Sequence, residues 1–180
     1  IFAEKGFAAT TTREISKQAG INKNLIFYYF NTKEGLYRNI IERNIAPVYE
    51  NISSVLSTGN SLDEVIESIV DAYFSQFIKK PDILPRILSR ELADGGKYIT
   101  EFFSKHFEEM LPLWIKFFGT EEASLHKHLL TIVNIIGSVV FIFLTQPIYS
   151  SLLKMQGASS LPNPEIKKHI ISFIKNGVSA

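Results

Sequence analysis

The chain has no cysteine, and its 180 residues include only two methionines and one tryptophan. The absence of cysteine excludes a disulfide framework, a thiolate nucleophile and a zinc site built on cysteine. No segment alternates apolar and polar residues over the length of a strand. Gly-rich phosphate loops, Glu-x-x-His pairs and serine nucleophile elbows are also missing. These absences argue against an enzyme and against a bound cofactor or metal.

A long charged or targeting segment is also missing, and the most apolar run, residues 129–144, carries no charge. This run is shorter than the ~20 residues that a membrane-spanning helix needs. It also contains Asn134 and Ser138, so we predict a buried helix rather than a membrane span. No signal peptide is visible. We therefore expect a cytoplasmic protein without a membrane partner.

The formal net charge of +1 conceals an uneven distribution of charge. Residues 1–46 contain seven Lys and Arg against four Glu, whereas the remainder contains twelve basic and fourteen acidic residues. Positive charge therefore gathers near the N-terminus, where it could meet phosphate groups.

Residues 11–36 have the pattern of two short helices joined by a glycine turn, with a third helix following directly. Thr11 or Thr12 caps the first helix, and Thr11 with Glu14 has the spacing of a capping box. Gly20 follows that helix, at a position where a positive φ is common and costs glycine little. Such a compact pair of helices is typical of a helix-turn-helix.

The second helix of the pair covers residues 23–30, with Asn22 as its cap and with Ile26 and either Tyr29 or Phe30 facing inward. Asn31 or Thr32 then caps the next helix. The outward side of the second helix carries donors, one cation and aromatic rings: Asn22, Lys23, Asn24, Phe27 and Tyr28. A solvated helix would usually carry Glu and Lys there. The surface therefore favours DNA binding over a plain helical bundle.

Several of these motifs together resemble the N-terminal domain of TetR/AcrR-family transcriptional regulators. The resemblance covers about residues 1–45 and rests on Phe2–Phe7, the threonines 10–12, Ala19-Gly20-Ile21, the aromatic run 27–30 and Lys33-Glu34. Tyr29 stands where the family usually has a histidine. The first helix of the family normally begins earlier than Ile1, so we expect further family residues before it.

This resemblance implies a regulator, expected to be a repressor, that binds a palindromic double-stranded DNA operator as a homodimer. Four residues are expected at the bases or beside them: Lys23, Asn24, Phe27 and Tyr28. A second set is expected to hold phosphates: Thr12, Arg13, Asn22, Tyr29 and Lys33. Thr11 is also expected to contact DNA.

Apolar residues at helical spacing continue from residue 33 to the C-terminus, and prolines at 47, 112 and 147 predict kinks or breaks. We predict an all-α protein of about nine helices. A helix-turn-helix domain would cover residues 1–46, and an effector-binding and dimerisation domain would cover residues 47–180. The segment 90–96 resembles a stretch common in the same family, but it identifies no ligand.

The run 129–144 is apolar on nearly every side, and such a helix has to be buried on every side. One side is expected to pack on the chain's own core and the other on a second copy. A single central helix wrapped by its own neighbours would satisfy the same pattern. The residues expected in the dimer interface are Val133, Ile136, Val140, Phe143, Ile170 and Ile174.

Aromatic residues recur along the segment 98–118 and on the helices expected beside it. They could line a pocket for a small hydrophobic effector, or they could simply fill the core. The candidate polar anchors are Arg90, Glu91, His106, His128 and Asn134. The candidate lining residues are Tyr73, Phe77, Phe103, Phe107, Trp114, Phe118, Asn134 and Phe141. The alternative is a constitutive helical DNA-binding dimer whose C-terminal domain binds a protein partner instead.

Overall fold

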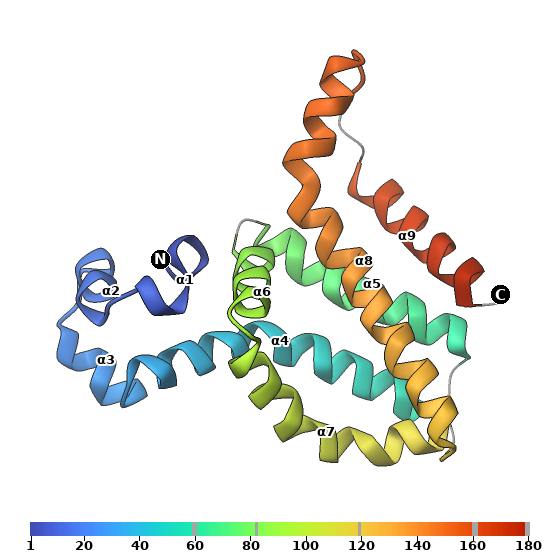
Figure 1. Cartoon of the computed structure of the whole chain (residues 1–180), viewed down its shortest axis with the longest axis horizontal. Helices are drawn as coiled ribbons and strands as arrows, with labels where there is room; N and C mark the ends of the chain where they lie inside the picture. The colour runs from blue at the N-terminus through green and yellow to red at the C-terminus, as the bar shows by residue number, and fades with distance from the viewer. Residues whose placement is uncertain (59–60, 82, 119, 160–161, 179–180) are drawn as a thin grey trace. The chain divides into compact units, whose positions relative to one another are not determined.

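The computed structural model describes the backbone of residues 1–58, 61–81, 83–118, 120–159 and 162–178. Side chains are described for the same residues except 113, 114, 116–118, 122–125, 128 and 178. Within the described residues there are nine helices and no strand (Figure 1), so the predicted all-α fold is confirmed. The helices are α1 (Phe2–Ala9), α2 (Thr12–Ala19), α3 (Lys23–Phe30), α4 (Lys33–Thr58), α5 (Leu62–Lys79), α6 (Leu84–Ala93), α7 (Lys97–Phe118), α8 (Glu122–Met155) and α9 (Asn163–Val178).

The contacts between residues divide the chain into two compact units. The first unit comprises residues 1–47 and 82–109, and the second comprises residues 48–81 and 110–180. Helices α4 and α7 therefore contribute to both units. The predicted domain boundary after residue 46 stays a prediction. The structure adds that α6 and the first part of α7 group with the N-terminal helices.

The caps predicted for α2 and α3 are present. The Glu14 N–H donates to Thr11 Oγ1 at 3.2 Å, and the Thr11 N–H donates back to the Glu14 carboxylate at 2.9 Å. Gly20 ends α2 in the left-handed region, at φ 66° and ψ 27°. The Asn24 N–H then donates to Asn22 Oδ1 at 2.9 Å, which caps α3. These local hydrogen bonds satisfy helix-end donors that would otherwise be unpaired, and they fix the turn between the two helices.

The junction between α3 and α4 depends on a close approach of the backbone. Asn31 ends α3 with φ 60°, and Thr32 Oγ1 accepts the Gly35 N–H at 3.0 Å, so Thr32 caps α4. A Cβ atom on Gly35 would lie 2.0 Å from the Phe30 carbonyl oxygen. Only glycine therefore allows the start of α4 to pack this closely against the end of α3.

Four aromatic rings form the centre of the first unit. Tyr37 of α4 is buried, and its ring centroid lies 4.9 Å from that of Phe2, 5.1 Å from Phe7 and 5.1 Å from Tyr98. The tilted and edge-to-face geometries are those that aromatic pairs favour. This cluster packs α1, α4 and α7 together, while α1 also contacts α6 (Figure 1).

Helix α5 is the centre of the second unit and packs against both α8 and α9. The rings of Phe74 and Phe77 on α5 lie 5.0 and 5.1 Å from Phe143 of α8, edge to face. From α9, Ile170 and Ile174 are buried. Exposed ion pairs such as Lys175–Glu67, at 2.7 Å, border this apolar contact and add little stability of their own.

Prolines do not break the long helices. Pro47, Pro112 and Pro147 lie inside α4, α7 and α8, and each helix continues through its proline as one element. In α8 this continuation extends the apolar helix as far as Met155. The breaks allowed by the sequence are therefore absent.

Candidate nucleic-acid interface

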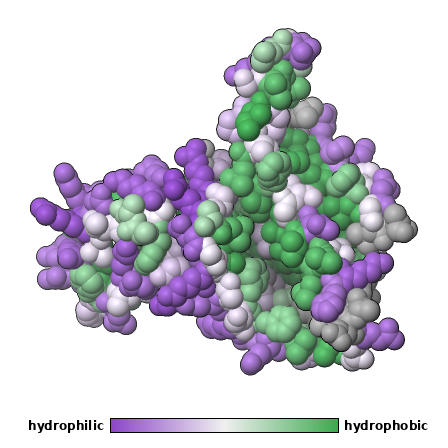
Figure 2. Space-filling model, in the orientation of Figure 1, coloured by the Kyte–Doolittle hydropathy of each residue, from purple (hydrophilic) through white to green (hydrophobic). Residues whose placement is uncertain are grey.

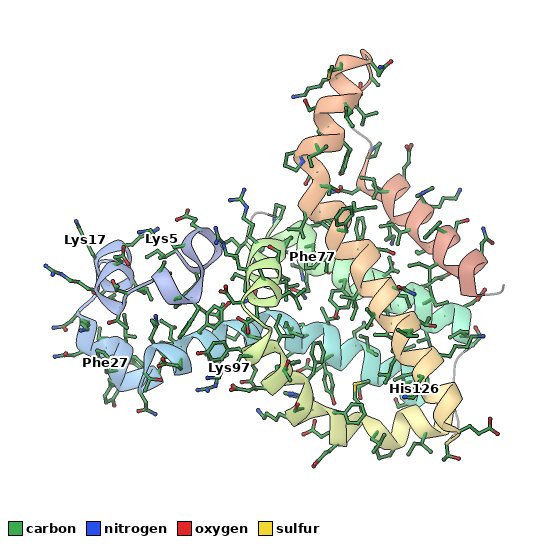
Figure 3. The ribbon with its side chains drawn as sticks, in the orientation of Figure 1. Lys5, Lys17, Phe27, Phe77, Lys97 and His126 are labelled. Atoms are coloured by element: carbon green, nitrogen blue, oxygen red, sulfur yellow. The ribbon has the colours of Figure 1, made fainter. Side chains whose placement is uncertain are left out.

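Helix α3 has one buried side and one strongly exposed aromatic side. Ile26 is 2% exposed, whereas Tyr28 is 78% and Tyr29 is 70% exposed. Phe30 is half-buried, so it takes the inward position for which Tyr29 was the other candidate. Phe27 is also exposed (Figure 3). The face predicted to read DNA is therefore open to solvent.

The exposed side chains of α3 are organised by contacts among themselves. The Lys23 ammonium lies 5.3 Å from the centroid of the Phe27 ring, one helical turn further on. The Tyr28 and Tyr29 rings meet edge to face at 5.1 Å. Tyrosine combines an apolar ring with a hydroxyl group, and it can contact both the sugar-phosphate backbone and base edges. Exposed aromatic clusters of this kind mark binding surfaces rather than solvated helix faces.

The helices α2 and α3 also carry exposed cations. Arg13 and Lys17 of α2 and Lys23 of α3 are exposed, and Figure 2 shows mostly hydrophilic surface over these helices. The N-termini of α2 and α3 add their helix dipoles, which favour bound anions. Asn22 and Asn24 are exposed at the start of α3. This combination can hold phosphates and offer hydrogen bonds to base edges.

Lys33 occupies a different place from the predicted one. Its Nζ donates to the carbonyl oxygens of Phe7 and Thr10, both at 2.9 Å, and lies 4.1 Å from the Phe7 ring centroid. These are carbonyls at the end of α1, where a cation is favourable. The Lys33 side chain therefore joins α4 to α1, and its predicted phosphate contact is not carried further. Sequence reasoning missed this role because the contact spans more than twenty residues.

The threonines at the start of α2 also have local roles. The Thr11 hydroxyl takes part in the capping box, and Thr12 is half-buried at the first residue of the helix. The Glu14 carboxylate accepts a hydrogen bond from Lys5 Nζ at 2.7 Å. That ammonium, together with the Thr11 N–H and hydroxyl, lowers the pKa of Glu14 to about 2. Glu14 is thus held ionised where it closes the cap of α2.

The residues predicted to line an effector pocket fall into several environments. Tyr73 and Phe77 are buried in the second unit, with ring centroids 6.0 Å apart. Phe103 and Phe107 belong to the first unit and are exposed.

The other predicted lining residues belong to α7 and α8. Asn134 and Phe141 lie on the exposed surface of α8. The side chains of Trp114 and Phe118 lie outside the described residues. Phe141, at 66% exposure, is a surface residue, so it is not carried into an effector site.

Four of the six residues predicted for the dimer interface pack inside their own chain. Val140, Ile170 and Ile174 are buried, and Phe143 packs on α5. A side chain covered by its own chain cannot also contact a partner, so these four are not carried further. Val133 remains a candidate at 63% exposure, and Ile136 is half-buried.

The structure reveals an exposed apolar stripe on α8 that the sequence did not single out. Its members are spaced three, eight, seven and four residues apart, all helical intervals, and so share one face of the helix. We call this set the α8 stripe: Leu130, Val133, Phe141, Ile148 and Leu152. Apolar surface follows the course of α8 in Figure 2. Because α8 is apolar all round, its sequence gave no signal of which face turns outward.

The extent of this exposure is large. By length and composition, residues Leu129–Met155 could cross a membrane, with a mean hydropathy of 2.1, yet only 17% of their most apolar window is buried within the chain. The expected burial on every side is therefore not achieved by one chain alone. A groove of about 380 Å³ also opens in the second unit, between α8 and α9, lined by Ile142, Tyr149, Leu153, Glu165, Ile166 and His169.

Comparison with known proteins agrees with the geometry of α1 to α3. Residues 1–40 match the family model described as bacterial regulatory proteins, tetR family. The chain is 29% identical over 107 residues to the uncharacterized HTH-type transcriptional regulator YerO of Bacillus subtilis, a match that covers 58% of the chain and 37% of YerO. It is 40% identical over 42 residues to IcaR of Staphylococcus epidermidis, a negative regulator of the biofilm operon, covering 23% of each protein. The matched regions thus span well under two thirds of these relatives.

A solved structure resembles the whole chain. The match is to the crystal structure of a TetR-family regulator from Streptomyces coelicolor. It covers 99% of this chain and 88% of that one, with a TM-score of 0.54 and 20% sequence identity. At this level of sequence identity, the similarity shows a shared fold and nothing more. It extends the agreement from the helix-turn-helix to the C-terminal helices.

Proposed function

Because the chain is a regulator of the TetR family, we propose that it binds a palindromic DNA operator as a homodimer and represses transcription until a small hydrophobic effector releases it. The exposed face of α3 carries this proposal, since it offers aromatic rings, amides and a cation where a helix-turn-helix meets the major groove. The likeness to IcaR, named a negative regulator, supports repression.

We call α1 to α3 and the start of α4 the reading head, and in this proposal its residues contact DNA in two ways. Lys23, Asn24, Phe27 and Tyr28 lie at the bases or beside them. Arg13, Asn22 and Tyr29 hold phosphates, and Lys17 adds positive charge nearby. Phosphate contacts fix the position of the protein on the duplex, whereas contacts to base edges select the sequence.

The α8 stripe supports the homodimer. A second copy that presents the same stripe would cover both in an isologous contact. Burial of apolar area is favourable at about 25 cal/mol per Å², and this stripe is apolar surface that a single chain leaves uncovered on the described part of α8. Val133, predicted from the sequence, belongs to this surface.

The effector is proposed to bind in the C-terminal helical region, where Tyr73 and Phe77 supply buried aromatic surface. Trp114 is the only tryptophan of the sequence, so it offers an internal fluorescent probe. Apolar compounds that change its emission should also weaken operator binding. A ligand shifts the equilibrium between two states only through its differential affinity for them. Compounds that bind tightly and leave operator affinity unchanged would contradict the effector proposal.

A second candidate function keeps the DNA-binding dimer but replaces the effector with a protein partner. The open apolar groove between α8 and α9 favours it, because an exposed groove suits a partner helix better than a small molecule. Specific capture of a helical partner that leaves the dimer intact would support this second candidate.

The DNA-binding proposal is tested with a duplex selected by the chain from a random pool. Tyr28→Ala should weaken binding by ~1–3 kcal/mol if the ring contacts a base. Lys23→Ala should behave likewise, or should lower the salt dependence by about one unit if the ammonium contacts phosphate. Lys154→Ala is the matched control, since it removes an exposed cation from α8. If both α3 variants bound the duplex like the parent, α3 would not be the helix that contacts the operator.

A further inference from the structure

Arg90, a candidate polar anchor for the effector in the sequence, connects α6 to α1 in the structure. Arg90 Nε donates to the Ala3 carbonyl oxygen at 2.9 Å, and its Nη2 donates to the Glu4 carbonyl oxygen. Both acceptors lie in α1, more than eighty residues away in sequence, and Figure 1 shows α1 beside α6. Arg90 is therefore engaged with the backbone of the DNA-binding unit.

The carbonyls of α1 are available because this helix is interrupted. Gly6 has φ 78° and ψ 175°, which is non-helical and suits glycine. The interruption disturbs the hydrogen bonds that Ala3 and Glu4 would otherwise accept from the following turn. An arginine can satisfy two such oxygens at once with its planar fork of donors. Gly6 also packs close to Arg90, whose Cδ would lie 3.8 Å from a Cβ at that position.

The residue after Arg90 fixes the helix that carries it. Glu91 is 3% exposed, and its Oε1 accepts the Tyr98 N–H at 2.6 Å. Burial and the nearby Glu91 carboxylate raise the pKa of Tyr37, so that phenol stays protonated. Glu91 thereby ties α6 to the start of α7 and to the buried aromatic cluster. Arg90 projects from a well-anchored element.

Beyond Arg90, α1 is connected to the other helices of the reading head. Lys5, which follows Glu4, binds the Glu14 carboxylate in the cap of α2. Lys33 of α4 binds the Phe7 and Thr10 carbonyl oxygens at the other end of α1. Helix α1 therefore receives a polar contact from α6, from α2 and from α4.

We propose that Arg90 is a positioning residue for operator binding, which sets the orientation of the helix-turn-helix through a relay from α6 to α1 and from α1 to α2. This inference rests on the proposed DNA-binding function. Arg90 does not touch DNA in this account. It holds α1, and Lys5 of α1 holds the capped start of α2 through Glu14.

The test measures the affinity of the full chain for its selected duplex in Arg90→Ala, Arg90→Lys and Arg43→Ala. Loss of a charged hydrogen-bond pair predicts about tenfold weaker binding for Arg90→Ala. Its salt dependence should match that of the parent, because no phosphate contact is removed. Arg90→Lys keeps the positive charge and a hydrogen-bond donor but loses the planar fork, so it should recover part of the loss. Arg43→Ala, which removes an exposed guanidinium of α4 without touching α1 carbonyls, should bind like the parent.

A double-mutant cycle with Glu14→Gln separates a relay from two independent structural effects. If Arg90 acts through α1 on α2, Glu14→Gln should weaken duplex binding less in the Arg90→Ala background than in the parent. The fold-loss of affinity in the double variant should then be smaller than the product of the two single fold-losses. Additive losses, parent-like binding by Arg90→Ala, or a salt dependence lowered by about one unit would each overturn the inference. If Arg90→Ala does not fold, Arg90→Lys carries the same cycle.

The outcome for the parent chain keeps this inference distinct from the proposed function. A parent that selects no duplex contradicts the DNA-binding proposal itself. A parent that binds a duplex while the Arg90 variants bind equally well contradicts only the relay.

Discussion

Gly35 determines how closely α4 approaches α3, since a methyl group there would lie 2.0 Å from the Phe30 carbonyl oxygen. Gly35→Ala should therefore force the junction apart, destabilise the chain by about 1–3 kcal/mol and weaken operator binding. Gly177→Ala is the control, because a Cβ there meets nothing within 4 Å, and it should stabilise α9 by roughly 0.5–1 kcal/mol. Thermal unfolding and duplex binding measure both effects. Equal behaviour of the two variants would contradict the close approach.

Glu14 makes the stability of the N-terminal helices depend on pH in the acidic range. Its folded pKa, about 2, lies below its ordinary value near 4.5, so its contribution is complete above about pH 4.5 and is lost as the pH falls towards 2. Glu14→Gln should remove this part of the acid sensitivity. Between these two pH values, the unfolding temperature of the parent should fall further than that of the variant. Parallel pH profiles for the two chains would argue against the ion pair with Lys5.

Residue roles that depend on neighbours in sequence could be predicted, and those that depend on distant contacts could not. The Thr11–Glu14 box, the left-handed Gly20 and the Asn22 cap follow from spacings of two or three residues. By contrast, Lys33 was assigned to phosphate because its binding partners, the carbonyls of α1, have no signature in the sequence. The same limitation concealed the contact from Arg90 to α1.

Among the helices, α8 departs most from expectation. Its extent and apolar character could be predicted, but its rotation could not, because apolar residues occupy all sides and leave no pattern to orient the helix. Contacts with α5 determine the rotation of α8. Ile135, Val139 and Phe143 face inward, and the α8 stripe faces outward. Phe143, predicted at a partner, packs on α5, whereas Phe141, predicted in a pocket, is exposed.

The α8 stripe predicts a clean separation between folding and assembly. Phe141→Glu adds a charge to a side chain that is already exposed in one chain, so the fold should persist while the dimer dissociates, because burying an unpaired charge in the interface costs several kcal/mol. Gln146→Glu adds the same charge to an exposed position off the stripe and should remain dimeric. Sedimentation measures the mass, and circular dichroism checks the helices. A dimeric Phe141→Glu protein, or a folded monomeric parent at micromolar concentration, would contradict the proposed interface.

For the whole molecule, the order and class of the elements were predictable, whereas their grouping was not. Periodicity and caps predict helices, but they contain no information on which distant helices meet. Residues 82–109 join the N-terminal helices through the aromatic cluster and Arg90, contacts that only the folded chain reveals. The chain thus combines a first unit, in which α6 and the first part of α7 join the N-terminal helices, with a second unit that exposes the α8 stripe.

In the proposed dimer, two α3 helices contact two half-sites of one operator together. Such half-sites lie about one helical turn apart, ~34–36 Å, on the same side of the duplex. The direct test compares the affinity of the full chain for its selected duplex with that for the same duplex carrying about five extra base pairs, half a turn, between the half-sites. We predict that the insertion reduces the affinity to that of a single half-site. Equal affinity for both duplexes would contradict the simultaneous binding of two half-sites by one dimer.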